Sequence, residues 1–111
     1  MSTNKRIKYG TKEIEKEYGP LTFAKILEAH RLGEEISQKE FANLLGISQQ
    51  SLCDLEKGRK IPTAERASKI ASKLDEPADF WIKIALQDML RAQHFDYEVS
   101  LSEPTKRKKV S

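Results

Sequence analysis

The chain has 111 residues, of which 38% are hydrophobic and 33% are charged, and its net charge is +3. These values suit one small domain with a charged surface. They argue against a membrane protein, because no apolar run approaches the ~18 residues of a membrane span. The N-terminus lacks the apolar core of a signal peptide and the single cysteine cannot form an intrachain disulfide, so we expect a cytoplasmic protein.

The positive charge is concentrated at the two ends of the chain. Residues 1–20 hold five Lys and Arg against three Glu, residues 21–92 hold eleven basic against eleven acidic residues, and residues 93–111 hold four against three. A neutral middle with basic ends is compatible with nucleic-acid binding but does not require it. We expect an N-terminal extension over 1–20, one helical domain over 21–93 and a separate C-terminal segment over 94–111.

Apolar residues recur at helical spacing through the middle of the chain, and this pattern predicts five helices and an all-α fold. The first is "LTFAKILEAHRLG", and we expect it to stop at Gly33. The second begins at Ser37, which forms an S-x-x-E capping box with Glu40, and it stops at Gly46. Its buried side is expected to consist of Phe41, Leu44 and Leu45.

The next three helices follow the same logic. Ser48 is the expected N-cap of the third helix, which stops at Gly58, and Thr63 leads into the fourth. Pro77 and the acidic residues around it suit the start of a fifth helix, "DEPADFWIKIALQDMLRAQ". The side chains expected to face the core are Leu52 and Leu55 in the third helix, and Ala67, Ile70, Ala71 and Leu74 in the fourth.

The two ends have other patterns. "TKEIEKEYG" predicts a short helix, and the last stretch, "SEPTKRKKVS", is polar and predicts disorder. In "HFDYEVSL" apolar and polar residues alternate, which predicts a strand over residues 95–101. A strand needs a partner for its backbone groups, and five helices offer no sheet, so we expect it to pair with a second copy or with another protein.

The second and third helices are joined by the tight turn Gly46-Ile47-Ser48, which is the layout of a helix-turn-helix. In that motif the second helix enters the DNA major groove by its N-terminal end. The outward face of this helix is predicted to hold Gln50, Cys53, Asp54 and Lys57, with Gln49 at the tip. A glutamine amide can bond in two places to the N6 and N7 edge of adenine, and the hydroxyls of Ser48 and Ser51 can donate to phosphate or base.

The stretch "SQKEFANLLGISQQSLCDLEKGRKIPT" resembles the Cro/C1-type (XRE) helix-turn-helix family. The family pattern is present as Ser37, Gln38, Ala42, Leu45, Gly46, Ile47, Ser48, Leu55, Glu56, Gly58 and Pro62. The resemblance covers roughly residues 21–76, and its "SQQSL…LEKG" part looks especially like lambdoid phage repressors. It implies a five-helix, lambda-repressor-like domain that binds double-stranded operator DNA and regulates transcription, as a repressor.

The resemblance also implies roles for single residues. Base reading falls to Gln49, Gln50 and Ser51, with Asp54 on the same face. Asp54 could accept a hydrogen bond from cytosine or simply pair with Lys57. Phosphate contacts are implied at Gln38, Lys57, Arg59 and Lys60, and Ser48 joins them through its hydroxyl. Gln38 is further expected to brace a reading glutamine, while a solvated loop is the alternative for the three basic residues.

The fifth helix carries more apolar residues than one core stripe requires. The simple alternative is a wide helix that fills the core. A two-fold operator needs two copies of the recognition helix, however, so we favour a homodimer face here. The residues predicted for this dimer or partner interface are Trp81, Ile82, Leu86, Met89, Phe95 and Tyr97, with Trp81 either in the interface or beneath it.

"DFWIKIALQDMLRAQHFDYEV" is similar to a segment of HigA-type antitoxins, in which a Phe-Trp pair opens the same helix; Phe80 and Trp81 match it. This similarity implies an alternative function, an antitoxin that neutralises a small basic RNase toxin and represses its own operon. A phosphate loop, a nucleophile with its base and metal-ligand spacing are all missing, so we expect no enzyme and no cofactor. The residues expected to be bystanders are Cys53, His30 and His94.

Overall fold

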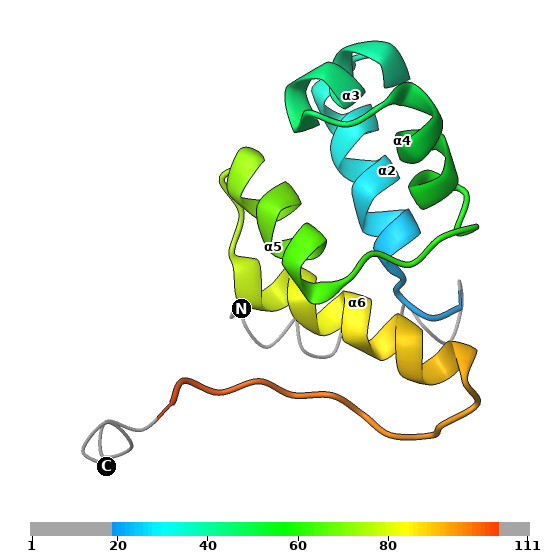
Figure 1. Cartoon of the computed structure of the whole chain (residues 1–111), viewed down its shortest axis with the longest axis vertical. Coiled ribbons are helices and arrows are strands. Elements are labelled where there is room, and N and C mark those ends of the chain that lie inside the picture. Colours follow the sequence, from blue (N-terminus) through cyan, green and yellow to red (C-terminus); the bar gives the residue numbers. More distant parts are fainter. Residues whose placement is uncertain (1–18, 105–111) are drawn as a thin grey trace, which may run out of the picture.

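The structure is a computed structural model that describes residues 19–104. Its helices are α2 (Phe23–Glu34), α3 (Gln38–Leu45), α4 (Gln49–Glu56), α5 (Ala64–Lys73) and α6 (Ala78–Ala92), as Figure 1 shows. The prediction of an all-α domain with five helices in this part is confirmed. The predicted short helix near the N-terminus, apart from Gly19, and residues 105–111 of the basic end lie outside the described residues.

Side-chain caps set where the helices begin. The Ser37 hydroxyl accepts the N–H of Glu40 and the Glu40 carboxylate accepts the N–H of Ser37, so the predicted capping box is confirmed. Ser48 caps α4 in the same way by accepting the N–H of Ser51. At the end of α3, Gly46 takes a left-handed conformation with φ 73°, which favours glycine. The caps therefore fix the turn between α3 and α4 from short-range contacts alone.

One boundary prediction and one burial prediction need correction. α2 does not stop at Gly33 but continues to Glu34, and Glu35 takes the left-handed position with φ 57°. The prediction that Gly58 stops α4 is confirmed, because Gly58 directly follows the C-cap Lys57 and takes a left-handed conformation with φ 74°. Leu44 is 48% exposed. The two turns of α3 place Phe41, Ala42 and Leu45 against the core, and Ala42 takes the buried position expected for Leu44.

The core is formed by one group of apolar side chains from all five helices. Phe23 of α2 meets Trp81 of α6 edge to face, with ring centroids 5.4 Å apart. His30 stacks on Phe41 and stays half-buried. Trp81 is only 3% exposed, so its prediction as an interface residue is wrong, because the side chain lies inside the domain under the surface of α6. The buried apolar residues are Phe23, Leu27, Phe41, Ala42, Leu45, Leu52, Leu55, Ala67, Ile70, Ala71, Trp81, Ile84 and Ala85.

Asp88 joins α6 to the start of α2. One carboxylate oxygen accepts the backbone N–H of Phe23 at 2.9 Å, and the other accepts from Arg91 at 3.1 Å. The Asp88 side chain keeps only 10% of its surface exposed. Burial raises the pKa of this carboxyl above that of an ordinary aspartate, against the opposing effect of the two hydrogen bonds.

The C-terminal segment, residues 95–104, runs alongside α6 (orange to red in Figure 1). Within residues 19–104 there is no strand, so the strand prediction for 95–101 is wrong. The Gln87 side chain replaces a strand partner, since its amide N–H donates to the Tyr97 carbonyl at 2.6 Å and its oxygen accepts the Val99 N–H at 2.8 Å. The backbone of this segment is therefore hydrogen-bonded to its own domain, and not to a second copy or another protein as predicted.

Candidate nucleic-acid interface

One side of α4 packs against the core of the domain, and the other side is exposed to solvent. Leu52 and Leu55 anchor it in the core with 0% and 3% exposure. Gln49 and Gln50 stand exposed in its first turn, and Ser51 is half-buried beside them. A short helix with an anchored inner side and polar side chains at its N-terminal end has the geometry that major-groove readers use.

A buried ion pair ties the end of α4 to α2 and α3. Glu56 receives two hydrogen bonds from Arg31 of α2, at 2.8 and 3.1 Å, and a third from the Gln38 amide of α3 at 2.9 Å. Only 3% of the Glu56 side chain and 14% of the Arg31 side chain is exposed. The hydrogen bond to Glu56 raises the pKa of Arg31, which stays charged. Gln38 therefore braces α4 through Glu56, and the prediction that it braces a reading glutamine is wrong.

The pair of Arg31 and Glu56 was not predicted from the sequence. Arg31 and Glu56 are 25 residues apart, so no local pattern joins them. The available signal was Glu56 itself, which stands in the family pattern between Leu55 and Gly58. An acidic residue on the inward side of a short helix requires a buried partner.

A second cluster lies on the outward face of α4. The same Asp54 oxygen accepts from the Gln50 amide at 3.1 Å and from Arg59 at 3.0 Å. The Arg59 hydrogen bond, with Gln50 assisting, lowers the pKa of Asp54. Asp54 thus pairs with Arg59 and not with Lys57, the alternative partner named from sequence. Arg59 also donates to the Cys53 sulfur at 3.4 Å, so this thiol contacts the cluster.

The hydrogen bond to Asp54 leaves part of the Gln50 amide free to bind a base. An amide has two N–H groups and one carbonyl oxygen, and Asp54 takes only one N–H. The remaining N–H and the oxygen are the donor and acceptor that the N6 and N7 edge of adenine requires. Asp54 therefore orients Gln50 without consuming its capacity to bond a base.

The remaining predicted residues fall into two groups that the structure separates. Ser48 and Lys57 are exposed at the two ends of α4, and Lys60 is exposed in the loop that follows it. The predicted interface residues lie on α6 and the C-terminal segment, away from α3 and α4 (Figure 1). Ile82 and Leu86 are half-buried there, and the more exposed members are Met89 at 40%, Phe95 at 49% and Tyr97 at 70%.

No helix within residues 19–104 is both long enough and apolar enough to pass through a membrane. The same range contains no group of three or more His, Cys, Asp and Glu side chains that could hold a metal ion.

The sequence was compared with known proteins. The sequence model of a family described as helix-turn-helix matches residues 27–81. The match includes all of α3, α4 and α5, most of α2 and the first residues of α6. No curated protein and no solved structure matches the chain. The family match supports a DNA-binding transcription regulator, and it covers every residue around α4 described above.

Proposed function

Because the chain belongs to the Cro/C1-type helix-turn-helix family, we propose that it is a transcriptional repressor that binds operator DNA as a homodimer. α4 enters the major groove, and Gln49, Gln50 and Ser51 contact base edges. The observation that carries this proposal is the Gln50–Asp54 hydrogen bond, which holds a base-reading amide on the exposed side of an anchored helix.

Side chains on either side of α4 bind the phosphates of the DNA backbone. The exposed side chains of Lys57 and Lys60 follow α4, and Gln38 starts α3 beside it. Arg59 is held by Asp54 in the free protein, so it must leave that carboxylate before it can bind phosphate. Specific recognition and backbone contact are therefore coupled at Asp54.

The homodimer is inferred from the two-fold symmetry expected of the operator. Two recognition helices must lie about 34 Å apart to read two half-sites on one face of the duplex. In the proposed homodimer, the partly exposed apolar side chains of α6 form the two-fold interface. Changing Ile82 and Leu86 together to Lys should give a folded monomer with poor operator affinity. Sedimentation of a wild-type protein that is already monomeric at micromolar concentration would exclude this interface.

The base contact is tested by selecting binding sites from random DNA with wild type and with Gln50→Ala. We expect the variant to lose ~1–3 kcal/mol of specific binding and to relax its preference at one or two base positions. Gln93→Ala is the matched control, because this glutamine is exposed at the end of α6. An unchanged preference in Gln50→Ala would show that the glutamine is only solvated.

A HigA-type antitoxin is the second candidate. It is supported by the C-terminal segment, where Phe95, Tyr97 and Leu101 remain exposed although they are apolar, so a partner could cover them. Deleting residues 94–111 should then abolish neutralisation of a co-expressed toxin and leave operator binding largely intact. Neutralisation that survives the deletion would exclude this segment as the toxin-binding element.

A further inference from the structure

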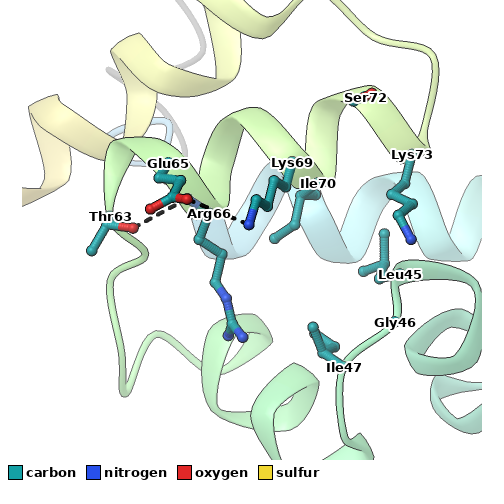
Figure 2. Close-up of a pocket in the computed structure, with 10 residues that line it drawn as sticks. All are labelled: Leu45, Gly46, Ile47, Thr63, Glu65, Arg66, Lys69, Ile70, Ser72 and Lys73. Carbon is teal, nitrogen blue, oxygen red and sulfur yellow. Dashed lines mark hydrogen bonds and ion pairs between the residues drawn. The ribbon is translucent and has the colours of Figure 1, made fainter.

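Arg66 of α5 lies between two grooves beside the recognition helix. A groove of about 280 Å³ separates it from α4 and is lined by Ser51, Lys60 and Thr63, among others. A second groove of about 510 Å³ lies between α5 and the turn that joins α3 to α4. Figure 2 shows the Arg66 side chain extending from α5 across the mouth of this second groove. Arg66 is the residue of α5 that lines both.

The charge of Arg66 is uncompensated among residues 19–104. Lys69, one turn further along α5, pairs with Glu65 at 3.4 Å. Arg59, in the loop after α4, pairs with Asp54. Arg66 is exposed and takes part in none of the ion pairs of this range, and only its backbone N–H is engaged, by the Thr63 hydroxyl. A guanidinium left free in this way offers a planar pair of donors that matches a phosphate.

The position of Arg66 relative to α4 specifies which phosphates it can reach. A helix in the major groove lies between two sugar–phosphate strands, which are about 12 Å apart across the groove. α3 and Gln38 flank α4 on one side, where Glu56 joins them. Ser51 faces the opposite side, where the small groove and Arg66 lie. The two sides of α4 therefore correspond to the two strands.

We propose that Arg66, with Lys60, binds a backbone phosphate of the strand opposite the one that α3 approaches. This inference rests on the proposed function, because it requires α4 to lie in the major groove. The bound phosphate occupies the small groove, which both Arg66 and Lys60 line. Arg66 positions the domain on any sequence and contributes no base preference.

The test is the salt dependence of DNA binding by the full chain. Each phosphate contact adds about 0.9 to the slope of log affinity against log salt. The affinity deficit of Arg66→Ala should therefore be larger at 50 mM than at 200 mM salt, by about 3.5-fold for each bound protomer and by about 12-fold for the proposed homodimer. Arg66→Lys should keep the wild-type slope, because the charge remains. Lys83→Ala is the control, since this lysine lies on α6 beside the C-terminal segment.

The outcomes separate this inference from the proposed function. A wild-type protein that selects no sequence and binds no DNA contradicts both. A wild-type protein that binds a selected sequence, together with an Arg66→Ala slope equal to that of wild type, overturns the Arg66 contact alone. A flattened slope with unchanged base preference supports it. Arg66 is exposed, so Arg66→Ala should unfold at the wild-type temperature, and circular dichroism checks this.

Discussion

Replacing Glu56 by Gln removes the charge at the centre of the Arg31–Glu56–Gln38 network and keeps the shape of the side chain. The charged side chain of Arg31, of which only 14% is exposed to water, then lacks the Glu56 carboxylate that pairs with it. Breaking a buried ion pair in this way costs ~3–5 kcal/mol, and the residual exposure of Arg31 places this case near ~2–3 kcal/mol. For a domain of this size that corresponds to a fall of about 10–20 °C in melting temperature.

Urea unfolding followed by circular dichroism measures this loss. Glu65→Gln is the matched control, because its pair with Lys69 is exposed, with 79% and 73% of the two side chains accessible. An exposed pair of this kind contributes at most ~1 kcal/mol. A double change of Arg31 and Glu56 to Met should recover much of the stability lost in Glu56→Gln, since no buried charge is left. A loss below ~1 kcal/mol in Glu56→Gln would refute the reasoning, because the network would then be screened by solvent.

Three further predictions follow from single residues. Gly33→Ala should raise the free energy of unfolding by ~1 kcal/mol, because the residue lies inside α2 with open space around its missing side chain, and an unchanged value would contradict this. Burial raises the pKa of Asp88, so the stability that its neutral form contributes is complete below about pH 4 and is lost as the pH rises through the raised pKa. Asn cannot ionise; the unfolding free energy of wild type minus that of Asp88→Asn should therefore fall as the pH is raised, and a difference that rises would contradict the sign. Gln87→Ala should speed amide hydrogen exchange at Val99, whose N–H it would leave unbonded, whereas equal protection would mean that the C-terminal segment is held by other contacts.

Local rules predicted the parts of the fold that depend on local contacts. Ser37, Ser48 and Thr63 cap helices because each accepts an N–H only three residues away, and this spacing is visible in the sequence. The position of the left-handed residue after α2 was predicted wrongly, because a glycine was taken as the signal for it. Gly33 was the nearest glycine, but Glu35 takes that conformation with two backbone hydrogen bonds to α2, so the helix continued past the glycine.

Contacts between distant residues were not predictable in the same way. The alternation of residues 95–101 indicated an extended chain correctly but a strand wrongly, because a side-chain amide on α6 satisfies the backbone as a neighbouring strand would. The outward face of α4 was predicted from helical periodicity, and its exposed glutamines lie there. The Asp54–Arg59 pair required the path of the loop after α4, which the sequence pattern did not contain.

Footprinting the full chain on a selected DNA sequence tests the central claim most directly. The account predicts two protected segments with two-fold symmetry, centred about one helical turn apart on one face of the duplex, and protection that weakens steeply with salt. It also predicts that Gln50→Ala weakens protection at these segments more than Gln93→Ala does. Protection that is uniform along the DNA, or that is the same for selected and random sequences, would contradict sequence-specific reading by α4.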